Sequence, residues 1–360
     1  MNENVIIEQG GLSKVTPSTW LALRQCPWRV LLARYYKEKP LLPSHPNATL
    51  GRILHTALEK VTKGELKTNE EFNLWWDKVV SQAEQELIGK GWGQFVPLKE
   101  NTRHFGLKKI QVRNRLKMHE NRSVSYNGGF SKAVEQKLSS SDGLLTGQLD
   151  CIIWRNDQAE IRDYKTGTIT TQDDDNEHPK VKEEYELQMK LYACLFNEHY
   201  GYFPNKLVLE DLNGKEYEVC FTEQESSILL TEIQSTLSLV NQNIANGESD
   251  KLSKTGEYCV SCQNRPVCSK YIRYLENPSA DTQTLWLDIT GKLMSISENK
   301  RGEIILALEK DGELFSVTGF ELDRLNEVDA MINQKVAIFN IKQAGVKKYA
   351  STKFSYIYVI

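Results

Sequence analysis

The chain has 360 residues with a formal net charge of −3, of which 40% are hydrophobic and 26% charged. This length allows two or three domains with their own cores, and the charge excludes an overall basic field that would attract nucleic acid. No apolar run approaches the roughly 18 residues of a membrane helix, and the first residues lack a signal-peptide pattern. We therefore expect a cytoplasmic protein with no membrane partner.

Two helices are expected near the N-terminus. The first covers residues 13–36 and should break at Cys26-Pro27, because proline inside a helix costs about 3 kcal/mol. The second covers residues 50–61 and carries Gly51 and His55 one turn apart on one face. A single helical histidine is usually an ordinary polar residue, but the glycine one turn earlier leaves room for another group to approach closely.

Residues 69–92 and 99–122 are also expected to be helical, and the second segment is the most basic part of the chain. Such a helix is most often a solvated face, yet local positive charge is also what contact with a phosphate backbone requires. Both interpretations stay open, with Lys109 and Arg113 as candidate DNA contacts. The basic residues of this segment are Lys99, Arg103, Lys108, Lys109, Arg113, Arg115, Lys117 and Arg122.

Residues 147–167 predict a β-hairpin with its turn at Asn156-Asp157. Asp150 then falls opposite Asp163, at a cross-strand Cα distance of about 4.5–5.5 Å. Two carboxylates so close repel each other unless a cation lies between them, and their oxygens suit Mg²⁺ or Mn²⁺. Lys165 lies on the face of Asp163 and can orient a water or stabilise charge on an attacked phosphate. The hairpin therefore indicates metal-assisted phosphodiester hydrolysis, with an ordinary hairpin bearing exposed charges as the alternative.

Two neighbouring segments add polar residues to this picture. Glu135, on a strand expected at residues 130–138, is either a further carboxylate near the metal or an exposed strand residue. The helix expected at residues 183–200 carries Gln188 and Tyr192 four residues apart on one stripe. Ordinary packing around one hydrogen-bonded amide is the alternative for that pair. Residues 170–184, which include three consecutive aspartates, are expected to form a loop.

Three late cysteines have the spacing C-x2-C-x5-C, namely Cys259, Cys262 and Cys268. Because a metal site commonly needs four thiolates, Cys26 at the expected helix break is the natural fourth ligand. Four thiolates suit either zinc or a 4Fe–4S cluster. Zinc sites usually pair their cysteines two and two, so the grouping of one and three favours iron, with zinc as the alternative.

Taken together, these motifs resemble the RecB-type branch of the PD-(D/E)XK nuclease superfamily, and specifically its iron–sulfur members. Those members include the CRISPR-adaptation nucleases, the AddB subunit of a helicase–nuclease, and single-strand exonucleases. The resemblance covers about residues 13–275. It rests on a Gly-x-x-x-His helix at Gly51 and His55, a G-x-x-D motif at Gly147 and Asp150, a D-Y-K-T-G motif at residues 163–167, a Q-x-x-x-Y helix at Gln188 and Tyr192, and the four cysteines.

The resemblance implies a role for each matching residue. Metal would be bound by His55, Asp150, Asp163 and the backbone carbonyl of Tyr164, and Lys165 would be the catalytic lysine. Gln188 and Tyr192 would orient the site or touch DNA. The resemblance also implies that Cys26, Cys259, Cys262 and Cys268 hold a structural 4Fe–4S cluster.

The C-terminal residues lie outside the resemblance. Strands are expected at residues 284–296, 302–309, 313–319, 335–343 and 353–360, with a short helical stretch between the third and fourth. This order resembles an OB-fold, a small barrel that often binds single-stranded nucleic acid. We expect about half of its aromatic residues to be core.

The expected fold is therefore an α/β chain, with an α+β restriction-endonuclease-like core and an all-β OB-like barrel. We expect a nuclease domain at residues 1–278, with a helical insertion at about 62–128, and the barrel domain at residues 279–360. The predicted function is Mg²⁺- or Mn²⁺-dependent hydrolysis of DNA, preferably single strands or ends and preferably as an exonuclease. DNA repair or recombination, CRISPR adaptation and mobile-element processing fit equally well. The alternative is a non-catalytic DNA-end scaffold for a helicase or integrase partner.

Overall fold

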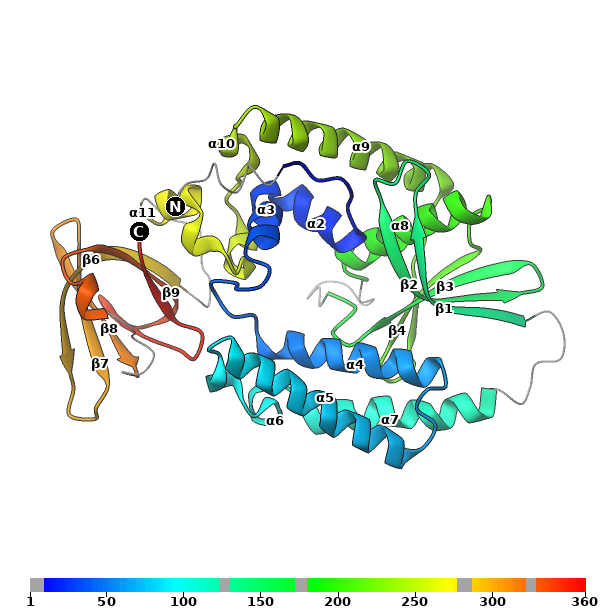
Figure 1. The fold of residues 1–360 in the computed structure, drawn as a ribbon, viewed down its shortest axis with the longest axis horizontal. Helices are drawn as coiled ribbons and strands as arrows, with labels where there is room; N and C mark the ends of the chain where they lie inside the picture. The colour runs from blue at the N-terminus through cyan, green and yellow to red at the C-terminus, as the bar shows by residue number, and fades with distance from the viewer. Residues whose placement is uncertain (1–9, 123–129, 172–179, 277–286, 322–327) are drawn as a thin grey trace. The chain divides into compact units, whose positions relative to one another are not determined.

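The computed structural model describes residues 10–122, 130–171, 180–276, 287–321 and 328–360 (Figure 1). The chain divides into two compact units. We call residues 10–24 and 45–245 the sheet unit, and residues 25–44 and 246–360 the barrel unit. Among the described residues, no helix is long and apolar enough to cross a membrane.

A five-stranded mixed sheet with the order β1-β2-β3-β4-β5 lies at the centre of the sheet unit. β3 and β4 run parallel and are connected through helix α8, whereas the other neighbours are antiparallel. Helix α8 packs on the first four strands, so it covers one face of the sheet. The strands are β1 (Phe130–Ser139), β2 (Thr146–Arg155), β3 (Gln158–Lys165), β4 (Lys206–Asp211) and β5 (Glu216–Glu218).

The helices of the sheet unit follow the expected segments closely. Helix α4 buries an apolar stripe that includes Leu50, Leu54 and Leu58, and it contacts β1, β3 and α7. Helix α8 ends at Gly201, whose φ of +79° is the left-handed conformation that glycine adopts readily. The helices are α2 (Pro17–Gln25), α4 (Pro46–Thr62), α5 (Asn69–Gly89), α6 (Leu98–Asn101), α7 (Phe105–Arg122), α8 (Glu183–Tyr200) and α9 (Glu223–Ala245).

The β2–β3 hairpin has the predicted turn and register. Asn156 and Asp157 have φ values of +48° and +67°, as a tight two-residue turn between twisted strands requires. Cys151 pairs with Arg162, so one further step along the ladder brings Asp150 opposite Asp163. The predicted turn, and the register of the hairpin as far as Cys151 and Arg162, are confirmed.

The barrel unit contains the predicted break at Cys26, which precedes helix α3 (Pro27–Tyr35) as its N-cap residue with extended backbone. The segment with the other three predicted ligands is formed by α10 (Ser249–Leu252), two short 3₁₀ turns, η2 (Glu257–Ser261) and η3 (Arg265–Val267), and α11 (Ser269–Glu276). The backbone amide of Leu42 donates to Gln263, so the early and late segments are joined within this unit.

The C-terminal strands form a closed five-stranded barrel of the expected OB-like kind. β10 pairs parallel to β8 and antiparallel to β9, and this closes the ring β6-β7-β8-β10-β9. β11 pairs with β9 beside that ring. The barrel strands are β6 (Leu287–Glu298), β7 (Ile304–Lys310), β8 (Glu313–Phe320), β9 (Lys335–Gly345), β10 (Lys348–Ala350) and β11 (Tyr356–Val359).

The closing strand is where the sequence-based expectation was incomplete. Residues 353–360 were expected to be the fifth strand, but the three-residue β10 closes the barrel and was not anticipated, because so short a strand has no alternating pattern. Of the aromatics, Phe320 and Phe339 are fully buried, and Phe315 and Tyr349 pack against the core. Half of the helical stretch expected before β9, residues 323–327, lies outside the described residues, and the described half contains η5 (Val328–Met331).

Candidate active site

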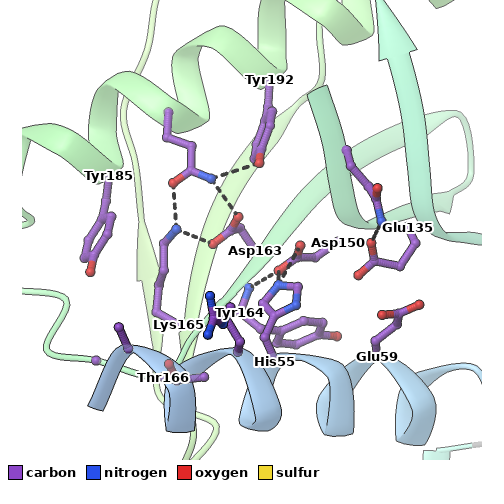
Figure 2. A pocket seen from close by; sticks show the side chains of 16 residues that line it. His55, Glu59, Glu135, Asp150, Asp163, Tyr164, Lys165, Thr166, Tyr185 and Tyr192 are labelled. Carbon is purple, nitrogen blue, oxygen red and sulfur yellow. Dashed lines mark hydrogen bonds and ion pairs between the residues drawn. The ribbon is translucent and has the colours of Figure 1, made fainter. Parts of the chain in front are cut away.

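A cavity of about 560 Å³ opens in the sheet unit between helix α4, the strands β1–β3 and helix α8. Figure 2 shows His55 reaching into it from α4, Asp150 and Asp163 from the two hairpin strands, and Tyr192 from α8. The hairpin, the Gly-x-x-x-His helix and the Q-x-x-x-Y helix therefore converge on one hollow.

The glycine of the α4 motif permits this convergence. A Cβ at Gly51 would lie 3.3 Å from Oγ1 of Thr166, in the turn directly after β3. A larger residue would therefore press α4 away from the end of β3. Gly147 is tighter still, since a Cβ there would lie 2.7 Å from the Leu195 side chain of α8. Both glycines serve close packing around the cavity.

His55, Glu135 and Asp150 bring one ligand atom each within 4.8 Å of one another, and they form the one such group of three or more found among the described residues. The Nε2 atom of His55 lies 3.1 Å from both carboxylate oxygens of Asp150. The backbone N–H of Tyr164 donates to Oδ2 of Asp150 at 2.8 Å. Asp150 is thus held from two sides while it faces the cavity.

Glu135 reaches this group through an unusual backbone conformation. Its φ is +56°, and the β1–β2 ladder skips it, pairing Val134 with Cys151 and Gln136 with Leu149. Left-handed backbone at a non-glycine residue is uncommon and concentrates at functional sites. The side chain of Gln148 donates to the Glu135 carboxylate. The sequence analysis placed Glu135 near the metal as one of two possibilities, and the structure places it inside the cavity.

Asp163 and Lys165 form a second, linked network. Lys165 Nζ lies 2.8 Å from Oδ2 of Asp163 and donates to the side-chain oxygen of Gln188 at 2.7 Å. The Gln188 amide in turn donates to Oδ1 of Asp163 at 3.3 Å and to the Tyr192 hydroxyl at 2.8 Å. One amide from α8 therefore orients the lysine, an aspartate and the tyrosine together (Figure 2).

The electrostatics of the cavity follow from three acidic groups packed near one another. The hydrogen bond with Asp150 raises the pKa of His55 to about 9. Burial, and then the Asp150 charge, raise the pKa of Glu135 to about 7. Burial and the same neighbouring charge also raise the pKa of Asp163. A site that binds a cation places carboxylates close together. Without the cation, their mutual repulsion raises their pKa values.

The residues fit a hard divalent cation. One imidazole nitrogen and carboxylate oxygens are ligands suited to Mg²⁺ or Mn²⁺. Oδ2 of Asp163 is buried, and Lys165 Nζ lies 2.8 Å from it as an ion pair. An added positive charge would offset the mutual repulsion of Asp150 and Asp163.

Two lining residues were missed by the sequence analysis. The Tyr185 ring lies 4.4 Å from Lys165 Nζ, in the geometry of a cation–π contact, and Glu59 of α4 faces the same cavity. Tyr185 precedes Gln188 by three residues and Glu59 follows His55 by four, so helical spacing was the available signal.

The basic segment 99–122 does not present one uniform face. Lys109 lies over the Trp76 ring and pairs with Asp77 at 3.4 Å, and Arg115 is buried against Glu210. Neither Lys109 nor Arg113 lines the cavity described above. Lys108 instead extends toward the turn after β3 and donates to the carbonyl of Thr166 at 3.1 Å.

The four predicted cysteine ligands all lie in the barrel unit and are all buried. Burial raises the pKa of the Cys259, Cys262 and Cys268 thiols, and the charge of Cys26 contributes to the shift at each. The four thiols are therefore within electrostatic range of one another. Within the described ranges they do not form a group whose sulfurs all lie within 4.8 Å.

Comparison with known proteins agrees with this geometry. A family model described as the PD-(D/E)XK nuclease superfamily matches residues 14–269. No curated protein matches the chain. A solved structure titled "Crystal structure of SSO0001" is 16% identical over 75% of this chain and 96% of that chain, with a TM-score of 0.32. The match to the family model spans most of the chain, and the protein belongs to the PD-(D/E)XK nuclease superfamily.

Proposed function

We propose that this protein is a metal-dependent deoxyribonuclease that hydrolyses phosphodiester bonds in single-stranded DNA or at DNA ends. The observation that carries the proposal is the convergence of Asp150, Asp163, Lys165 and His55 on one cavity. Such a set unites anionic ligands for a cation with a cationic donor for a phosphate. Removal of nucleotides from an end is the preferred mode, in DNA repair, recombination, CRISPR adaptation or mobile-element processing.

Some of these side chains would bind the metal ion, and Lys165 would contact the phosphate. His55, Asp150, Asp163 and the Tyr164 carbonyl, with Glu135 alongside, would hold a Mg²⁺ or Mn²⁺ ion, which would lower the pKa of water and polarise the attacked phosphate. Lys165 is held by Asp163 and by the Gln188 amide, so its ammonium is already aimed into the cavity. A donor oriented in advance stabilises developing charge without reorganisation during the reaction.

We also propose that Cys26, Cys259, Cys262 and Cys268 hold a 4Fe–4S cluster of structural role, with zinc as the alternative. Zinc binds thiolates at about 2.3 Å, which brings four sulfurs within about 4 Å of one another. The cysteines of the described chain form no group that tight, so the support for the cluster is the C-x2-C-x5-C spacing and the burial of the four thiols. Iron and sulfide analysis of protein purified without oxygen tests the proposal, and one zinc per chain without iron would contradict it.

A second candidate is a non-catalytic scaffold that binds DNA ends for a helicase or integrase partner. The single observation in its favour is the OB-like barrel, because barrels of this kind often bind single strands. A scaffold has no use for buried, mutually repelling carboxylates, so the catalytic proposal accounts for more of the structure.

Cleavage of labelled DNA tests the catalytic proposal. Wild-type protein with Mn²⁺ is expected to degrade linear single strands faster than closed circles, and Lys165→Met and Asp163→Asn are expected to lower the rate at least 100-fold. Asp157→Asn is the matched control, because this exposed aspartate lies in the turn of the same hairpin and asparagine tolerates its positive φ.

The outcomes separate the candidates. Equal cleavage by wild type and both site variants would remove the catalytic assignment of Lys165 and Asp163. DNA binding without cleavage by the wild type, over a range of divalent metals, would favour the scaffold. Faster cutting of closed circles than of linear strands would contradict the exonuclease preference.

A further inference from the structure

A second cavity of about 510 Å³ adjoins the first within the sheet unit. Lys165, Thr166 and Gly167 line both cavities, so the turn after β3 is a shared wall. The opposite side of the second cavity is formed by the start of helix α7 and by the residues before it. A group placed there would therefore be the immediate neighbour of a phosphate held at Lys165.

The second cavity offers two cationic side chains that form no ion pair with a carboxylate of the described residues. The side chain of Arg103 lines it and forms no hydrogen bond or ion pair with a residue that the structure describes. Lys108 crosses it to the Thr166 carbonyl and leaves two ammonium donors for another acceptor. Burial lowers the pKa of Lys108, so an anion brought close to it would favour the charged form.

Lys108 and the next residue, Lys109, make different contacts. Lys109 follows Lys108 on the same helix but turns to Asp77 and the Trp76 ring, where its charge is already paired. Lys108 has no acidic partner among the described residues and sits against a carbonyl instead. A half-buried lysine that lacks a carboxylate retains its capacity to bind an anion.

One acidic residue, Asp211, also lines the second cavity. Its Oδ1 atom accepts the backbone N–H groups of Asn213 and Lys215, which fix it in the turn between β4 and β5. Its charge opposes those of Arg103 and Lys108, and the balance of the three side chains remains positive. The amide side chains of Asn47 and Gln111 supply further neutral donors at the edge.

We propose that this second cavity binds a phosphate group of the substrate strand, next to the phosphate attacked at Lys165. The inference rests on the proposed function and deepens it, because it assigns Arg103 and Lys108 to substrate positioning. Two phosphates of one strand held on either side of residues 165–167 would fix the strand relative to the carboxylates. The phosphate is either an internal phosphodiester or a terminal monophosphate.

Binding of fluorescent single-stranded oligonucleotides in EDTA, which prevents cleavage, tests the inference. Lys108→Gln and Arg103→Gln are each expected to weaken binding by about tenfold and to lower the slope of log K against log salt by about 0.7. Lys78→Gln is the matched control, since Lys78 is exposed on helix α5 and lines neither cavity. Lys108→Arg keeps the charge and should retain most of the affinity.

Three substrates distinguish the two sources of the phosphate. If the ligand is an internal phosphodiester, closed circles and linear strands should show the same loss with Lys108→Gln. If it is a terminal monophosphate, strands phosphorylated at one end should show the loss, and circles and strands with hydroxyl ends should not. Either pattern supports a phosphate site at Lys108 and Arg103.

The inference is overturned if Lys108→Gln and Arg103→Gln bind every substrate as Lys78→Gln does. Arg103 is exposed, so its variant remains informative even if Lys108→Gln does not fold. A wild type that cuts no DNA would instead refute the proposed function. A wild type that cuts DNA while the variants bind normally would refute only the second phosphate site.

Discussion

Two buried aspartates, one in each unit, have opposite surroundings. Asp288 of the barrel unit accepts from Arg265 Nε at 2.6 Å and Nη2 at 3.2 Å, and also from the Tyr271 hydroxyl and the Asn340 backbone N–H at 2.8 Å. Asp163 of the sheet unit is contacted by Lys165 and by the Gln188 amide, but it also faces a second carboxylate, Asp150. Both side chains are only about 4% exposed.

The difference distinguishes Asp288, which stabilises the fold, from Asp163, which belongs to the candidate active site. The groups hydrogen-bonded to Asp288 are all donors, and the Arg265 guanidinium also donates to the Cys262 carbonyl and lies over the Phe339 ring. This pair joins the cysteine segment to the barrel. Around Asp163 the repulsion from Asp150 is only partly offset by Lys165 and His55, and such arrangements belong to sites completed by a ligand.

The largest expected effect is on stability, and it should be much larger at Asp288 than at Asp163. Asp288→Asn is expected to lower the free energy of unfolding by about 3–5 kcal/mol, because it leaves Arg265 buried without its partner. Asp163→Asn should cost clearly less, because the repulsion from Asp150 that it removes offsets the ion pair with Lys165 that it also removes. Urea denaturation measures both. Equal destabilisation by the two substitutions would break the comparison.

An intermediate effect is expected when metal is added. Mn²⁺ at one hundred times its dissociation constant should stabilise the wild type by about 2.7 kcal/mol. Asp150→Asn should lose this stabilisation, whereas the turn variant Asp157→Asn should keep it. Thermal denaturation with and without EDTA supplies the measurement. Retained stabilisation in Asp150→Asn would place the cation elsewhere.

The smallest expected effect is the pH dependence that Glu135 confers on the metal-free protein. Its folded pKa of about 7 lies above its ordinary value, so its contribution to stability is full below about pH 4.5 and is lost as the pH rises through 7. Relative to Glu135→Gln, the free energy of unfolding of the wild type should therefore fall by about 1 kcal/mol between pH 5 and 8. This figure is reduced because solvent screens the charge of a partly exposed side chain. A constant difference across this range would show that Glu135 ionises normally.

Local patterns in the sequence determined the secondary structure and most of the site. The Asn156-Asp157 turn predicted the register that brings Asp150 opposite Asp163, because the two-residue periodicity of strands leaves little freedom once a tight turn is set. Proline after Cys26 predicted the helix break, and helical spacing paired Gln188 with Tyr192, which are hydrogen-bonded.

Only the tertiary structure decided which charges act together. Nothing in the sequence distinguishes Lys108 from Lys109, yet a rotation of about 100° along the helix sends one to the turn after β3 and the other to Asp77. Likewise, Glu135 enters the acidic group through a left-handed residue in a strand, and a three-residue strand closes the barrel. These features depend on contacts between segments distant in sequence, whereas turn chemistry and helical period are local.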